Sequence, residues 1–332
     1  MSILDKQDYT LIERLTSLSQ GQLKNVMTKF LKQRYDKVIA RKEYLVAVGD
    51  IPIALVAHMD TVFKSPVSNL YYDTKKEVLW SPDGLGADDR AGVFAIIKIL
   101  QSGLRPSVIL TTDEEKGGIG ASKLSDKKCP IKGLKYMIEL DRRGKDDCVF
   151  YDCYNEEFID YVERFGFKEQ WGSFSDISFL MEAWKTCGVN LSVGYFDEHS
   201  VSETLHLKYL FKTIEKVKVM LQETDIPEFE YRELVYDYSR LGRLNPYSAY
   251  ATVYGQHCSG CKNLYSEYDL FPAKGADGLT KYFCPDCIVG RVEWCDYCGE
   301  AFEICSNSSQ KICKECEDKL CTTTSSNNSK ES

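Results

Sequence analysis

The sequence predicts an α/β fold, a three-layer sandwich with a mostly parallel or mixed central sheet, followed by a small cysteine-rich domain. Two observations predict it. Short runs of consecutive apolar residues alternate with helical patterns through the first 225 residues, which is typical of strands covered on both faces by helices. Beyond residue 255 this alternation stops and closely spaced cysteines replace it.

The individual elements follow from apolar runs and from helical spacing. Strands are expected where Val, Ile and Leu cluster, at 43–48, 53–58, 107–112, 135–140 and 189–194. Apolar positions at helical spacing predict helices at 90–101, 155–165 and 204–222, and Gly103 suits the end of the first of them. The same spacing runs through 9–42 with a break near Gly21, so we expect two short packing helices there.

The chain divides by composition into four parts. We expect residues 1–225 to form one catalytic-type α/β domain and residues 226–254, which are rich in tyrosine, to form a linker. Residues 255–321 hold ten of the 14 cysteines and form the cysteine-rich module. The polar residues 322–332 are expected to be a disordered tail.

Charge and hydropathy exclude several classes of protein. The net charge of −8 argues against a nucleic-acid-binding protein, which needs clustered Lys and Arg. The first residues are polar and resemble no secretory signal, and no apolar run approaches the roughly 20 residues of a membrane span. We therefore expect a cytoplasmic protein without membrane contact, whose cysteines stay reduced or bind metal.

The stretch SPDGLGADDRAG places two adjacent aspartates, Asp88 and Asp89, in a glycine-flanked turn before an apolar helix. Asp89 is suited to cap that helix, but capping does not explain the pair. Two adjacent carboxylates repel each other unless a positive charge lies beside them. The turn therefore indicates a cation site.

Further polar side chains follow the ends of predicted strands. They are His58, Asp60, Glu114, Glu115, Asp141 and His199. In an open α/β sheet ligands bind at the carboxyl ends of the strands, so these side chains are expected at one edge. Imidazoles and carboxylates suit zinc, and one carboxylate can bridge two ions about 3.5–4 Å apart. The pattern predicts a two-metal site.

These motifs, HMDTV, GADDRAG, DEE, LD and the late histidine, resemble in order those of the co-catalytic di-zinc exopeptidases, which include peptidase T and the bacterial leucyl aminopeptidases. The resemblance covers roughly residues 40 to 222. It implies a first zinc on His58, Asp88 and Asp141, and a second on Asp88, Glu115 and His199. It also implies that Glu114 is the general base for a metal-bridging hydroxide, and that Asp60 orients His58.

Some assignments around this site stay open. Glu139 is a rival of Asp141, although the alternation in MIELD and the family motif favour Asp141. Tyr195 is a possible oxyanion donor or a core or rim residue, and His206 is expected to be a packing or surface residue. The metal is zinc, cobalt or manganese. Only 58 positions separate Asp141 from His199, so we expect a catalytic core without the lid domain of peptidase T.

The cysteine-rich module contains four C-x-x-C pairs: Cys258/Cys261, Cys284/Cys287, Cys295/Cys298 and Cys313/Cys316. Two such pairs complete a tetrahedral zinc site, so eight cysteines predict two structural zinc ions. Sequential pairing resembles tandem zinc ribbons, whereas a cross-braced pairing also fits the spacing. Cys305 and Cys321 remain as plain thiols.

The leading functional hypothesis is a zinc-dependent aminopeptidase that hydrolyses short peptides. A carboxypeptidase or an N-acyl amino acid deacylase would use the same metal set, and only the substrate pocket distinguishes the three. A different class is a non-catalytic binding platform that recruits a protein partner, or a second copy, through the zinc module. The intact set of candidate ligands, together with Glu114, favours an enzyme.

Overall fold

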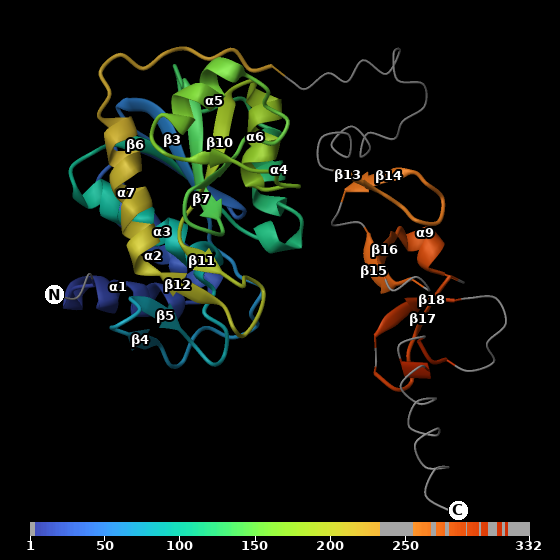
Figure 1. Ribbon diagram of the computed structural model, residues 1–332. Coiled ribbons are helices and arrows are strands. Elements are labelled where there is room, and N and C mark those ends of the chain that lie inside the picture. The colour runs from blue at the N-terminus through green and yellow to red at the C-terminus, as the bar shows by residue number, and fades with distance from the viewer. Residues whose placement is uncertain are drawn as a thin grey trace, which may run out of the picture. The chain divides into compact units, whose positions relative to one another are not determined.

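The structure, a computed structural model, describes residues 4–232 and, in the C-terminal part, residues 255–266, 270–275, 279–289, 291–298, 300–304, 311–313, 316 and 317. The chain divides into two compact units, residues 1–234 and 235–332 (Figure 1). Most of the predicted linker, the predicted tail and both plain thiols lie outside the described residues.

The larger unit is built on an eight-stranded mixed sheet. Its strand order is β1 (Lys37–Ala40), β2 (Tyr44–Val48), β6 (Pro106–Thr111), β3 (Ile51–His58), β7 (Tyr136–Arg142), β10 (Cys187–Ser192), β8 (Asp147–Val149) and β9 (Lys168–Glu169). The four central strands, β6, β3, β7 and β10, run parallel to one another. All six residues of β6 and of β10 are buried, as expected of strands covered on both faces.

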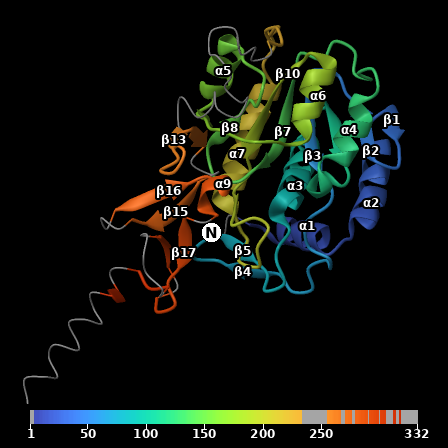
Figure 2. The same cartoon turned by 90° about the vertical axis from the view of Figure 1, so that its right-hand side faces the viewer.

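Helices cover both faces of this sheet (Figures 1 and 2). The helices are α1 (Lys6–Thr16), α2 (Gln20–Lys32), α3 (Ala87–Gln101), α4 (Ile119–Ser125), α5 (Glu156–Glu163), α6 (Asp176–Trp184) and α7 (Leu207–Leu221). In the sheet β6 lies on one side of β3 and β7 on the other, so the connections β3–α3–β6 and β6–α4–β7 cross the sheet in opposite directions. Because such crossovers are right-handed, they place α3 and α4 on opposite faces. Helices α1 and α7 pack against α3, and α6 packs against α4.

A small second sheet joins two distant segments of the larger unit. Its strand order is β11 (Tyr195–Phe196), β12 (Thr204–His206), β5 (Val78–Trp80) and β4 (Tyr71–Asp73). β12 pairs with β5, with Thr204 opposite Trp80. The loop from β11 to β12, which carries His199, is therefore anchored beside the segment that leads into α3.

Two boundaries differ from the prediction. The break between the first two helices lies at Ser17–Ser19 and not at Gly21, because Ser19 and Gln22 form a capping box that starts α2 before the glycine. The predicted helix at 204–222 begins at Leu207, since Thr204–His206 pair in the small sheet. His206 is half-buried and its ring stacks on Tyr209, as expected of a packing residue.

Residues 226–232, which begin the predicted linker, run along the larger unit. Glu230 forms an isolated bridge with Thr186, and its carbonyl accepts a hydrogen bond from Asn155 Nδ2 at 2.8 Å. Across the described part of the chain, no helix has both the length and the apolar character needed to cross a bilayer.

The smaller unit consists of short strands and short helical segments. A two-stranded sheet pairs β13 (Gly255–His257) with β14 (Leu264–Ser266). A four-stranded sheet has the order β16 (Thr280–Phe283), β15 (Phe271–Lys274), β18 (Ala301–Glu303) and β17 (Val292–Trp294), and α9 spans Pro285–Ile288. The buried clusters in the described part of this unit are small: two are built around cysteines, and a third consists of Ala273, Phe283 and Val292.

Candidate metal centre

The predicted site residues of the larger unit meet at the carboxyl edge of the parallel strands. His58 is the last residue of β3, and Asp141 is the penultimate residue of β7. Glu114 and Glu115 form the 3-10 turn η1 (Glu114–Lys116) after β6. Asp88 lies in the first turn of α3, where its backbone is not helical. The common direction of the strands brings these distant residues to one edge.

Asp88 lies between two imidazoles. Its Oδ1 is 2.9 Å from His58 Nε2, and its Oδ2 is 3.1 Å from His199 Nε2. On the first side Asp141 Oδ1 lies 3.6 Å from His58 Nε2. On the second side Glu115 Oε2 lies 3.1 Å from His199 Nε2. The potential ligand atoms on each side lie within 4.8 Å of one another, so the two oxygens of Asp88 are placed to serve two adjacent ions.

Asp89 shapes the turn that presents Asp88. The peptide bond between the two aspartates is cis. Asp89 is fully buried, and its carboxylate accepts hydrogen bonds from the backbone N–H of Gly92 at 2.8 Å and of His58 at 3.1 Å. A Cβ on Gly92 would lie 2.2 Å from the Leu140 carbonyl oxygen, so this position tolerates only glycine. Asp89 thus caps the helix and ties it to the end of β3.

Asp60 connects His58 with the turn that carries Glu114 and Glu115. Its Oδ1 lies 3.3 Å from His58 Nδ1 and accepts the backbone N–H of Glu114 at 3.0 Å. Its Oδ2 accepts the backbone N–H of Glu115 at 3.2 Å. One carboxylate therefore orients an imidazole and holds the turn that carries both glutamates.

Asp141 is held by three side chains, only one of which was a predicted site residue. Tyr195 Oη donates to Asp141 Oδ1 at 3.1 Å, and Ser175 Oγ donates to Oδ2 at 3.2 Å. Asn190 Oδ1 accepts the Asp141 backbone N–H at 3.0 Å. The Tyr195 hydroxyl is thus engaged with a candidate ligand, and its role as an oxyanion donor remains a prediction. The rival Glu139 is buried, and its Oε1 accepts a hydrogen bond from the backbone N–H of Ile177 at 3.3 Å.

Glu203 is a site residue that the sequence analysis missed. It is fully buried, and its carboxylate accepts the backbone N–H of Gly86 at 2.6 Å and that of Asp88 at 3.0 Å. It therefore holds the turn before α3 from the loop that also carries His199. These contacts span 117 and 115 positions of sequence, and no local pattern marks such a residue.

The electrostatics of the site indicate a need for positive charge. Burial, with negative Asp141, Asp176 and Asp88 nearby, raises the pKa of Glu114 to about 9. Burial and Asp88 raise the pKa of Glu115 to about 7, and its Oε1 is buried without a hydrogen-bond partner among the described residues. Burial and Asp88 raise the pKa of Asp141 to about 6. Divalent cations would neutralise this excess negative charge, so the donor set fits two such ions.

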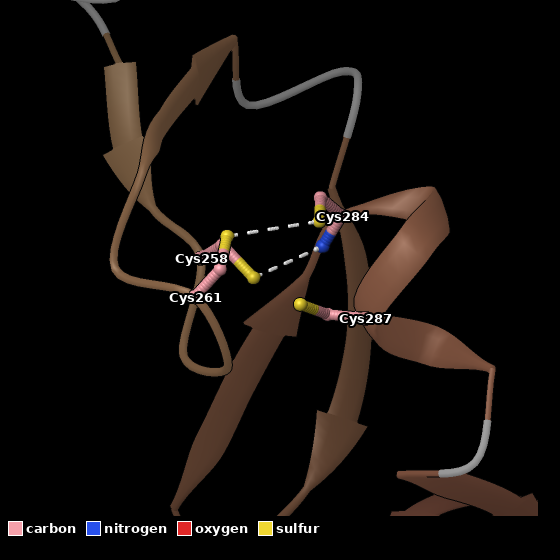
Figure 3. A group of neighbouring side chains, drawn as sticks. All are labelled: Cys258, Cys261, Cys284 and Cys287. Carbon is pink, nitrogen blue, oxygen red and sulfur yellow. Dashed lines mark hydrogen bonds between the residues drawn. The ribbon is translucent and has the colours of Figure 1, made fainter.

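In the smaller unit the eight predicted cysteines lie in two groups, in sequential order. Each group brings four Sγ atoms within 4.8 Å of one another; the groups are Cys258, Cys261, Cys284 and Cys287, and Cys295, Cys298, Cys313 and Cys316. In the first group Cys261 Sγ lies 4.0 Å from Cys284 Sγ (Figure 3). In the second, Cys298 Sγ lies 3.8 Å from Cys313 Sγ. Four converging thiols suit a closed tetrahedral zinc site.

Backbone donors prepare the first group for an ion. Burial raises the pKa of the Cys258 thiol, but the backbone N–H groups of Cys284, Cys261 and Gly260 more than offset this and lower it to about 6. The Cys284 N–H donates to Cys258 Sγ at 3.3 Å (Figure 3). A Cβ on Gly260 would lie 2.9 Å from Cys287 Sγ, so this glycine leaves room for the fourth thiol.

Comparison with known proteins supports the fold. No family model matches the sequence, and no curated protein matches it. A tripeptidase of Staphylococcus aureus is similar in structure, with a TM-score of 0.55 and 13% identity, over 67% of this chain and 100% of that one.

Two aminopeptidases are similar to about the same degree. PepT of Bacillus cereus has a TM-score of 0.52 and 14% identity, over 65% of this chain and 97% of that one. The TET aminopeptidase of a marine-sediment thaumarchaeote has a TM-score of 0.53 and 13% identity, over 67% and 98%. The predicted α/β fold class is therefore confirmed, and about two thirds of the chain share the fold of these peptidases.

Proposed function

We propose that the chain is a metal-dependent exopeptidase, most simply an aminopeptidase that acts on short peptides. The observation that carries the proposal is the carboxylate of Asp88, whose two oxygens face His58 at 2.9 Å and His199 at 3.1 Å. Asp141 completes one side and Glu115 the other. The fold shared with a tripeptidase and two aminopeptidases supports peptide hydrolysis over other two-metal reactions.

Each residue has a distinct part in the proposed reaction. His58, Asp88 and Asp141 would hold one cation, and Asp88, Glu115 and His199 the other. When bound, two divalent cations polarise a substrate carbonyl and acidify water. Glu114 would take the proton from the attacking water and deliver it to the leaving amine. The pKa of Glu114, raised to about 9 by burial, would fall beside two cations, which favours the carboxylate that this step needs.

The surrounding residues would position these groups and not react. Asp60 holds His58 and both backbone N–H groups of the glutamate turn, so Glu114 is directed into the site. Tyr195 holds Asp141 in place, and its hydroxyl is close enough to the ligands to take part as an oxyanion donor in the complex with substrate.

For the smaller unit we propose two structural zinc ions, one in each cysteine group. Its buried clusters are too small to stabilise a fold alone, so metal binding would supply much of the folding free energy. We place its boundaries near residues 255 and 321. We propose that this module binds a protein partner or a second copy of the chain, because it contains none of the candidate catalytic residues.

The test is peptide hydrolysis by wild type and by Glu114→Ala. Zinc-loaded protein is incubated with a mixed peptide library and the products are identified by mass spectrometry. We expect ladders shortened from the amino end, and a rate lower by about 10²–10⁴ in Glu114→Ala with unchanged metal content. Asp88→Ala, in contrast, should lose both catalytic ions.

Other outcomes assign a different function. Ladders shortened from the carboxyl end, or loss of acyl caps, would make the chain a carboxypeptidase or a deacylase with the same site. Full activity in Glu114→Ala would refute the proposed general base. Absence of cleavage by the fully metal-loaded wild type would refute the exopeptidase and favour a binding platform.

A further inference from the structure

A cavity of about 360 Å³ opens beside the candidate metal centre. Several of the residues that line it belong to the site or adjoin it in the chain, among them Asp60, Lys116, which follows Glu115, and Gly86, whose N–H is held by Glu203. The cavity therefore adjoins the site through Asp60 and through the segments that carry Glu115 and Asp88. Its volume lies in the range of small-ligand pockets, about 300–1,000 Å³, and suits one amino-acid residue.

The walls of the cavity are fixed by close contacts. The loop after β3 packs on the turn before α3 so tightly that a Cβ on Gly84 would lie 2.1 Å from the Phe63 ring. A Cβ on Gly86 would lie 2.8 Å from Thr61 Cγ2. The third wall, the turn between α1 and α2, is joined to the loop by the hydrogen bond from the Val67 N–H to the Thr16 carbonyl at 3.1 Å. The cavity is thus formed without a ligand.

Positive charge predominates in the lining. Arg90 is buried, its guanidinium donates to the backbone carbonyls of Met59 and Leu18, and the carboxylates of Asp60 and Asp89 lie close enough to balance its charge, so Lys64 is the residue whose charge is open to a ligand. Lys64 lines the cavity and has no ion-pair partner among the described residues. Lys116 is paired with Asp113 at 2.6 Å.

The negative charge in the lining is already engaged. Asp60 is the acidic residue of the lining, and its carboxylate is directed to His58 and to the backbone of the glutamate turn. Apolar side chains, Leu18, Phe63 and Leu85 among them, complete the surface. An anionic group with a short aliphatic stem matches a lining of this kind, because the stem contacts the apolar walls and the charge faces Lys64.

We propose that this cavity binds a carboxylate of the peptide substrate, with Lys64 as the residue that selects it. The inference rests on the proposed peptidase function and specifies its substrate class. The carboxylate has two possible sources, the side chain of an aspartyl or glutamyl residue and the free carboxyl end of a short peptide. Both present the same chemistry to Lys64 and differ in which peptides are preferred.

The experiment measures zinc-dependent hydrolysis of three peptides: a neutral tripeptide, its carboxyl-terminal amide, and the same amide with one acidic residue. Wild type is compared with Lys64→Glu, and with Lys132→Glu, an exposed lysine outside the cavity lining that gives the same change in net charge. We expect Lys64→Glu to lower kcat/KM about 3- to 20-fold for peptides that present the recognised carboxylate, as for reversal of one exposed charge. The amide without an acidic residue should change less than about twofold, and Lys132→Glu should behave as wild type.

The pattern of losses identifies the source. Loss with the free tripeptide assigns the terminal carboxylate, and loss with the acidic amide assigns the side chain. An equal change for all three peptides, or none for any, refutes the proposal while the peptidase function stands. If wild type cleaves neither these peptides nor the mixed library, that function fails, and the cavity is tested by calorimetric binding of the free tripeptide and of the acidic amide to zinc-loaded wild type and Lys64→Glu. Equal affinity of the two proteins for both peptides then refutes the proposal, and weaker binding of either peptide to Lys64→Glu supports it.

Discussion

Glu203 offers the sharpest test of how the metal-binding turn is held. In Glu203→Ala the backbone N–H groups of Gly86 and Asp88 lose their acceptors, at 2.6 and 3.0 Å, inside a site where Glu203 itself is fully buried. An unpaired buried donor costs about 1–3 kcal/mol, so two of them cost about 2–6 kcal/mol. That is a large part of a typical unfolding free energy of about 5–15 kcal/mol.

The glutamine variant separates charge from hydrogen bonding. Glu203→Gln keeps one carbonyl oxygen as an acceptor, so one N–H stays paired and the loss should be about half, roughly 1–3 kcal/mol. Glu198→Ala is the matched control in the same loop, since the ion pair that it removes is the 3.0 Å contact with exposed Arg143. Surface pairs of this kind contribute about 0–1 kcal/mol.

The assay is urea unfolding of the three variants and wild type without metal, with zinc affinity measured in parallel. We expect the order wild type, Glu198→Ala, Glu203→Gln, Glu203→Ala in decreasing stability. Zinc affinity should fall with Glu203→Ala because Asp88 loses its support. A Glu203→Ala variant within about 0.5 kcal/mol of wild type would show that the two N–H groups find other partners and would refute the reasoning.

Two further predictions concern the metals. Hydrogen bonding to Asp88 raises the pKa of His199 to about 9, and burial raises that of Glu115 to about 7, so both bind protons at pH 7 that a cation must displace. Zinc binding should therefore release protons at pH 7, release fewer near pH 9 and weaken as the pH falls below 7. Calorimetry in buffers of different ionisation enthalpy measures the number of protons released. Equal heats of zinc binding in all buffers at pH 7 would contradict the prediction. Cys284→Ser should lower the bound zinc by about one ion per chain, whereas Cys305→Ser should leave the zinc content unchanged. Elemental analysis measures the zinc content of each variant. Equal zinc content in the two variants would exclude the first cysteine group as a zinc site.

Much of the larger unit could be predicted from local patterns. The buried strands are recognisable in the sequence as apolar runs. The ends of β3, β6, β7 and β10 lie within two residues of the ends of the predicted ranges. The candidate ligands could be found because each stands at the end of such a strand, in a loop that follows one, or in the first turn of α3. The physical reason is that parallel strands end at one edge, so strand order along the chain already gathers His58, Glu115 and Asp141.

The sequence by itself thus predicted the fold class, the candidate ligands and the four C-x-x-C pairs, from apolar runs, motifs and spacing along the chain. Only the tertiary structure decided that the cysteine pairs group in sequential order and how the candidate ligands are held. The support of Asp88 by Glu203, that of Asp141 by Tyr195 and Ser175, and the cavity beside Asp60 arise where segments 34 to 117 positions apart meet. Hydrogen bonds over such separations depend on how elements pack, and packing leaves no periodic or local mark in a single sequence.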